Sequence, residues 1–224
     1  NVLQGLALHR EVLSPLEQRH LVGFVRRLAD HGDEGALVNR TYSAPRRWMR
    51  GKGRITVQLG CCYNYAADKA GNPPGILTRE KVAGLPPLLH QIIDRMTQRG
   101  IFSAATRPDT CIINFYTEGD CIPPHIDHLD FARPFVTLSL LSSQPILFGA
   151  SIDVVSEGEF AAPFSCKLPS APEADDGEGL TPGAVVTDGA MWIECWDSVS
   201  ESLFYFNKIA GARQLEVPPE ILLK

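Results

Sequence analysis

The spacing of hydrophobic positions changes along the chain, from helical in the first hundred residues to alternating afterwards. Ser14-Pro15-Leu16-Glu17 supplies an N-cap, a proline at the first helical position and a capping-box glutamate. Apolar residues then recur at helical spacing to about Gly32. A second helix is predicted from Pro87 to Arg99, with Gly100 as its stop. Residues 1–100 are therefore predicted to be the helical part of the chain.

From Cys111 onward, apolar residues alternate with period two, which is typical of strands. Short apolar runs bounded by Pro, Gly, Ser and Asp predict further strands at 135–141, 145–148, 152–155, 184–187, 191–195 and 203–206. An acidic loop is predicted at 170–182. We expect an α+β chain with N-terminal helices and a barrel or sandwich over 101–224, the whole forming one domain, 1–224.

Composition narrows the class of protein. The 224 residues are 44% hydrophobic, which is enough for a real core, and the formal net charge is −5. Any attraction to nucleic acid must then come from a local patch. The six cysteines include no C-x-x-C pair, which favours a reducing compartment, and no apolar run approaches the length of a membrane span. We expect a soluble protein of the cytoplasm or nucleus, monomeric and without a membrane partner.

A local basic patch does exist, because no acidic residue occurs between Glu34 and Asp68. Its members are Arg40, Arg46, Arg47, Arg50, Lys52 and Arg54. Arginines interleaved with aromatic rings suit single-stranded RNA, in which phosphates meet guanidinium groups and bases stack. Tyr63 and Tyr65, two positions apart, are predicted to share one face over the mouth of a site. A solvated positive face and ordinary sheet packing of the tyrosines are the alternatives.

The tripeptide His125-Ile126-Asp127 is the sharpest chemical signal in the sequence. In extended backbone, side chains two positions apart point the same way, so His125 and Asp127 can bind one metal ion. A second imidazole would complete the facial triad of non-haem Fe(II) oxygenases. Asn114 and Tyr116 have the same spacing one strand earlier and can offer an amide and a phenol to a small polar ligand. The alternative is a loop with a common tripeptide.

Three runs of sequence resemble the AlkB family of Fe(II)- and 2-oxoglutarate-dependent dioxygenases, most closely its plant branch that demethylates N6-methyladenosine in RNA. They are residues 43–54, residues 60–76, and the stretch from Asn114-x-Tyr116 through His125-x-Asp127 to Arg133-Pro134. The resemblance implies a double-stranded β-helix (jelly-roll) fold. It implies that His125 and Asp127 ligate iron, that Asn114 and Tyr116 contact 2-oxoglutarate, and that the substrate is single-stranded RNA such as mRNA, gripped by the lid that carries Tyr63 and Tyr65.

The chain departs from that family after about residue 170. The family places a second iron-binding histidine and a carboxylate-binding arginine on late strands, whereas this chain has no histidine after His128 and only Arg213 as a late arginine. Asp188, Glu194 and Asp197 are chemically able to replace the histidine, with a weaker match. A truncated or alternatively spliced form and a catalytically inactive RNA-binding relative both explain the departure. A cupin-like metal protein, and a zinc site of Cys121, His125 and His128, are more distant alternatives.

Overall fold

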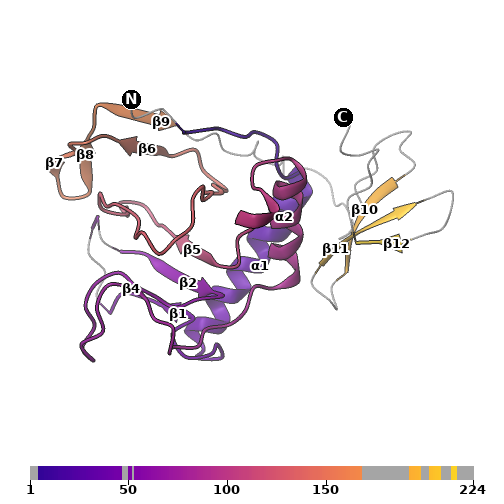
Figure 1. Cartoon of the computed structure of the whole chain (residues 1–224), viewed down its shortest axis with the longest axis horizontal. Helices are drawn as coiled ribbons and strands as arrows, with labels where there is room; N and C mark the ends of the chain where they lie inside the picture. The colour runs from indigo at the N-terminus through magenta and orange to yellow at the C-terminus, as the bar shows by residue number, and fades with distance from the viewer. Residues whose placement is uncertain are drawn as a thin grey trace. The chain divides into compact units, whose positions relative to one another are not determined.

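The structure is a computed structural model that describes residues 5–46, 50–51, 53–167, 192–197, 202–207 and 213–215 (Figure 1). The described residues divide into two compact units. The first takes in Val25–Leu85 and Pro108–Ala171 with the N-terminal residues up to Arg10, and the second takes in Glu11–Phe24, Pro86–Arg107 and the strands after Pro172. The prediction of one domain over 1–224 stays a prediction.

Both predicted helices are confirmed. Helix α1 spans Pro15–Asp33, and its capping box is formed. The Ser14 N–H donates to Glu17 Oε2 at 2.7 Å, and the Glu17 N–H donates to Ser14 Oγ at 3.2 Å. Helix α2 spans Pro87–Gln98, followed by Gly100 with a φ of 71°, a conformation that glycine adopts without a steric penalty.

The second unit has an apolar core built from the start of α1 and from α2. Its buried side chains are Val12, Leu13, Leu16, Leu21, Phe24, Leu88, Leu89, Ile92, Ile93, Met96 and Phe102. One buried ion pair lies among them, because Arg95 of α2 pairs with Glu17 of α1. The strands of this unit are β10 (Trp192–Asp197), β11 (Ser202–Asn207) and β12 (Arg213–Gln214), all antiparallel, so the strands predicted at 191–195 and 203–206 are confirmed.

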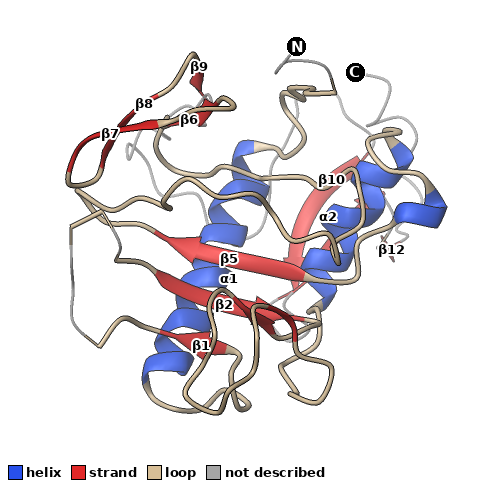
Figure 2. Cartoon of the chain, turned by 60° about the vertical axis from the view of Figure 1, so that its left-hand side comes forward, coloured by secondary structure: helices blue, strands red, loops and turns tan. Residues whose placement is uncertain are grey.

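The first unit is organised by a three-stranded antiparallel sheet with the order β1-β2-β5 (Figure 2). Strand β1 is Tyr42–Ser43, β2 is Ile55–Leu59 and β5 is Cys111–Phe115. The alternation predicted from Cys111 is confirmed, whereas β1 and β2 were not predicted. One face of β2 is apolar, with Val57 and Leu59 0% and 1% exposed. Gly32 of α1 lies so close to the Tyr42 ring that a Cβ there would overlap it.

The remaining strands of the first unit form small antiparallel pairs (Figure 1). They are β3 (Tyr63–Asn64) with β4 (Gly75–Ile76), β6 (Pro145–Phe148) with β9 (Phe164–Lys167), and β7 (Asp153–Ser156) with β8 (Glu159–Ala161). The strands predicted at 145–148 and 152–155 are confirmed. The predicted jelly roll stays a prediction, because these pairs are separate small sheets in the part of the chain that the structure describes.

The strand predicted at 135–141 is wrong, because this segment has no strand assignment. Phe135, Leu138 and Leu141 are exposed. An apolar run becomes a strand only when a neighbouring strand accepts its backbone hydrogen bonds, and no described segment pairs with this one. The predicted strand at 184–187 and the predicted loop at 170–182 lie outside the described residues. None of the described helices is long and apolar enough to cross a membrane.

Candidate metal centre and lid

The second face of the sheet is polar, and it positions Asn114. Residues directly opposite each other in an antiparallel pair share a face, and Thr56 lies opposite Asn114. The Asn114 Oδ1 accepts hydrogen bonds from the Thr56 hydroxyl at 3.1 Å and from the Arg54 Nε at 3.3 Å. Because both contacts use the oxygen, the Nδ2 of Asn114 is presented as a donor. Tyr116, two residues further, belongs to the same face.

His125 and Asp127 come together as their spacing predicts. The His125 Nε2 and the Asp127 Oδ1 are 3.5 Å apart, and their side chains are 45% and 42% exposed. The His125 Nδ1 lies 2.8 Å from the Pro123 carbonyl oxygen. A carbonyl only accepts, so this contact places the proton on Nδ1 and leaves the Nε2 lone pair for a metal ion, as is usual for metal-binding histidines.

The residues present fit two of the three protein positions in an Fe(II) facial triad. One imidazole nitrogen and one carboxylate oxygen are suitable donors, and their separation lets both reach one cation. No group of three metal-binding side chains occurs among the described residues. Of the sequence alternatives, Asp188 lies outside the described residues, and only the backbone of β10, which carries Glu194 and Asp197, is described.

The zinc alternative has no support among the described residues, because two of its three side chains, those of Cys121 and His128, make other contacts. The Cys121 thiol donates to the Gly51 carbonyl oxygen at 3.0 Å. The His128 Nδ1 accepts a hydrogen bond from the Asp130 N–H at 3.3 Å and lies 3.2 Å from the Asp130 carboxylate. Neither residue joins His125 in a described metal-binding group.

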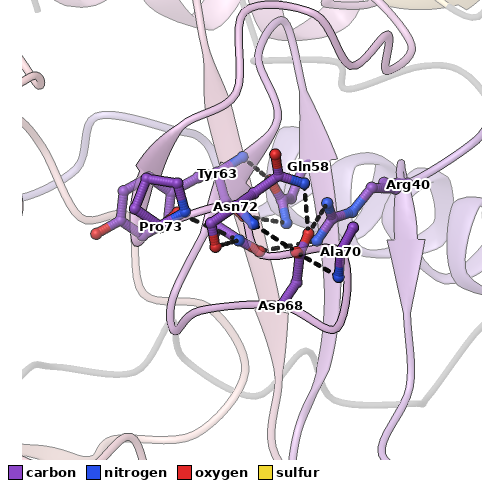
Figure 3. Close-up of polar contacts among 8 residues, drawn as sticks. Arg40, Gln58, Tyr63, Asp68, Ala70, Asn72 and Pro73 are labelled. Carbon is purple, nitrogen blue, oxygen red and sulfur yellow. Dashed lines mark hydrogen bonds and ion pairs between the residues drawn. The ribbon is translucent and has the colours of Figure 1, made fainter.

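The loop between β3 and β4, residues 65–74, belongs to the predicted lid and is called the lid loop; it is held in place by Asp68 (Figure 3). The Asp68 carboxylate accepts hydrogen bonds from the backbone N–H groups of Ala70 and Asn72 at 3.0 and 2.9 Å and from the Asn72 amide at 3.0 Å. It also pairs with the Arg40 guanidinium at 3.0 Å. The Asn72 side chain, then the other donors including Arg40, lower the pKa of Asp68 to about 2.

The same network ties this lid loop to the sheet. Arg40 also donates to the Asn64 Oδ1 at 2.8 Å, and Asn64 donates to the carbonyl oxygens of Asn72 and Pro73. The Gln58 side chain, on the polar face of β2, bonds both the N–H and the carbonyl of Tyr63 (Figure 3). The sequence reasoning missed Thr56, Gln58 and Asp68. Of these three residues, only Asp68 could have been predicted from the sequence, because Asp with a nearby Gly and Asn is typical of a side-chain-stabilised turn.

Tyr63 and Tyr65 stack edge to face, with ring centroids 5.0 Å apart. Together with Arg40, Gln58 and Asn64 they line a polar pocket of about 550 Å³ between the lid loop and the edge of the sheet. Tyr63 also contacts Phe131, with 5.0 Å between centroids. Burial raises the pKa of both tyrosines, so both hydroxyls are neutral and able to donate at neutral pH.

The described members of the basic run lie in different surroundings. Arg46 and Arg50 are exposed, whereas Arg47 and Lys52 lie outside the described residues. Arg40 is paired with Asp68. Arg54 turns toward Asn114, with its guanidinium carbon 5.1 Å from the centre of the Tyr65 ring.

Comparison with known proteins identifies the class. Residues 5–171 match the 2OG-Fe(II) oxygenase superfamily, and the chain belongs to this family. It is 53% identical over 169 residues to the RNA demethylase ALKBH9B of Arabidopsis thaliana, and 29% identical over 170 residues to the RNA demethylase ALKBH10B of the same plant. A third relative, the RNA demethylase ALKBH5 of Xenopus laevis, is 30% identical over 110 residues.

These matches cover 75%, 75% and 45% of this chain, and 33%, 29% and 30% of the respective relatives. The chain therefore spans about a third of the length of the curated relatives that it matches. The family implies Fe(II) and 2-oxoglutarate, and it implies the jelly-roll fold. The resemblance to AlkB-type RNA demethylases is confirmed.

Proposed function

We propose that this chain carries out oxidative demethylation of N-methylated bases in RNA, with Fe(II) as cofactor and 2-oxoglutarate as cosubstrate. N6-methyladenosine is the proposed base. The observation that carries the proposal is the convergence of His125 and Asp127, with the His125 Nε2 available to a metal, in a chain of the 2OG-Fe(II) oxygenase family. The names of the three relatives support RNA as the substrate.

In this proposal, His125 and Asp127 hold the metal ion, and Asn114 and Tyr116 bind 2-oxoglutarate. When bound, Fe(II) couples the decarboxylation of 2-oxoglutarate by O₂ to hydroxylation of an N-methyl carbon, and the product releases formaldehyde. The Thr56 hydroxyl fixes the orientation of the Asn114 amide, so that its Nδ2 donates to the cosubstrate. Burial raises the pKa of Tyr116, which keeps its hydroxyl protonated as a second donor.

RNA contacts are assigned to the lid and to the basic run. Tyr63 and Tyr65 offer ring faces for stacking on a base, and the adjoining pocket lies in the size range of small-ligand sites. Exposed Arg46 and Arg50 are proposed to contact phosphates. Arg47 and Lys52 are assigned the same role from the sequence alone. Single-stranded RNA is favoured because its bases can leave the stack at low cost. The cytoplasm and nucleus remain the proposed locations.

A catalytically inactive RNA-binding protein is the second candidate. It is favoured by two observations: the sequence has no histidine after His128, and no group of three metal-binding side chains occurs among the described residues. Such a protein would retain RNA without consuming 2-oxoglutarate.

The two candidates are separated by incubating the chain with an oligonucleotide that contains N6-methyladenosine, Fe(II), 2-oxoglutarate and O₂. Mass spectrometry of the nucleosides and a succinate assay report the reaction, and filter retention reports RNA binding. Demethylation that is lost in His125→Ala and Asp127→Asn, with RNA retention unchanged, supports the enzyme. Retention without any succinate in the parent chain supports the inactive relative. Loss of retention in Arg46→Gln/Arg50→Gln, with metal binding intact, tests the RNA surface.

A further inference from the structure

Arg54 is placed beside the residues that are proposed to bind 2-oxoglutarate. The register of β2 with β5 pairs Ile55 with Phe115. If this register is extended by one residue, Arg54 lies opposite Tyr116. Opposite residues of an antiparallel pair share a face, so Arg54, Asn114 and Tyr116 belong to one face. The Arg54 Nε donates to the Asn114 Oδ1 at 3.3 Å, and the guanidinium lies 5.1 Å from the centre of the Tyr65 ring. The side chain is half-buried.

The charge of Arg54 has no counter-ion among the described residues. Arg40, Arg95 and Arg107 each pair with a carboxylate, whereas no described carboxylate forms an ion pair with Arg54. Its neighbours are neutral: the Asn114 amide, the Thr56 hydroxyl and the two phenols of Tyr65 and Tyr116. A guanidinium is always charged, and a partly desolvated cation is costly unless an anion joins it. This arrangement is therefore suited to an anionic ligand.

The identity of the anion follows from the neighbours. A phosphate of RNA would be contacted best by an exposed arginine such as Arg46, whereas Arg54 is drawn inward against the amide of Asn114. A 2-oxo acid that chelates a metal uses its keto oxygen and the adjacent carboxylate, which leaves the second carboxylate for a protein cation. The planar guanidinium matches a carboxylate with two parallel hydrogen bonds.

We propose that Arg54 binds the carboxylate of 2-oxoglutarate that is remote from the keto group, an inference that rests on the proposed function. Arg54 is then a determinant of cosubstrate specificity for dicarboxylates, and it is not assigned to RNA binding.

The test compares two ligands that differ in that carboxylate alone. Anaerobic calorimetry on the full chain with Fe(II) measures the affinity for 2-oxoglutarate and for 2-oxovalerate, in which a methyl group replaces the remote carboxylate. Arg54→Gln should weaken the affinity for 2-oxoglutarate by about tenfold to a hundredfold, as expected for the loss of a charge-assisted hydrogen bond. The affinity for 2-oxovalerate should stay unchanged. Arg54→Lys should retain part of the preference. Arg79→Gln, which removes an exposed charge elsewhere in the same unit, should bind both ligands as the parent does.

Each contrary result identifies a different failure. Equal weakening of both ligands in Arg54→Gln would mean that Arg54 only braces the sheet and lid, and would overturn the inference. An unchanged preference together with lost RNA retention would make Arg54 a phosphate contact, which also overturns it. A parent chain that binds 2-oxoglutarate no better than 2-oxovalerate would contradict a remote-carboxylate anchor of any kind. A parent chain that binds neither ligand would refute the proposed function, and the inference with it.

Discussion

The hydroxyl of Thr56 links β2 to the amide that is proposed to bind 2-oxoglutarate, so its removal tests how the sheet builds the site. Thr56 is 5% exposed and donates to the Asn114 Oδ1 at 3.1 Å. Valine has nearly the same shape, and Thr56→Val therefore deletes the hydrogen bond with little change in packing. A buried hydrogen bond contributes about 1 kcal/mol net, so we expect the free energy of unfolding to fall by about 1–2 kcal/mol.

The same substitution should reduce the affinity for 2-oxoglutarate. Without the Thr56 hydroxyl, the Asn114 Oδ1 keeps only the 3.3 Å contact with Arg54, and the amide can rotate away from its donating orientation. If the loss of this orientation costs about 1 kcal/mol of binding free energy, the affinity for 2-oxoglutarate falls about fivefold. Calorimetry in the presence of Fe(II) measures the affinity, and urea denaturation measures the stability.

Thr56→Ser is the matched control, because it keeps the hydroxyl and removes a methyl group. It should cost about 1 kcal/mol of stability through lost apolar burial and leave the affinity for 2-oxoglutarate near that of the parent. Stability thus falls in both variants, and ligand affinity falls only in Thr56→Val. Parent-like affinity in Thr56→Val, or equal losses in both variants, would refute the role assigned to this hydrogen bond.

Three further predictions follow from buried and paired groups. Glu17→Gln should lower the free energy of unfolding by about 3 kcal/mol, because it removes the carboxylate that pairs with the buried Arg95 guanidinium; a loss below about 1 kcal/mol in urea denaturation would contradict this. The lowered pKa of Asp68 means that its lid contacts are complete above about pH 4 and are lost only as the pH falls through about 2; a carboxyl NMR midpoint near the ordinary 3.8 would be inconsistent with the network. Burial raises the pKa of Cys111 to about 11, so iodoacetamide at pH 8 should modify it far more slowly than a free thiol; a rate equal to that of glutathione would contradict the raised pKa.

The helices were predictable because their signals are local. The capping box of α1 lies within four consecutive residues, and Gly100 marks the end of the second helix. Strand β2 was missed because its apolar alternation covers only five residues beside a basic run, and its partner β5 lies more than fifty residues later. The strand predicted at 135–141 was wrong for the complementary reason: an apolar run alone does not supply a pairing partner.

The candidate site shows the same division between local and distant information. The shared faces of Asn114 with Tyr116 and of His125 with Asp127 follow from alternation along one segment. The contacts of Arg54 and Thr56 with Asn114 depend on a register between distant strands, and the pairing of Arg40 with Asp68 spans 28 positions. Counting charges along the sequence therefore grouped Arg40 and Arg54 with the exposed arginines. In the fold, Arg40 pairs with Asp68, and Arg54 donates to the Asn114 amide oxygen.

The claim on which the account depends is that His125 and Asp127 bind Fe(II) and that 2-oxoglutarate completes this site. An anaerobic titration of the chain with Fe(II) and 2-oxoglutarate, followed by visible absorption, measures this directly. We expect a metal-to-ligand charge-transfer band that saturates at one equivalent and is absent in His125→Ala. A parent chain that stays colourless, or a band that persists unchanged in His125→Ala, would contradict the assignment.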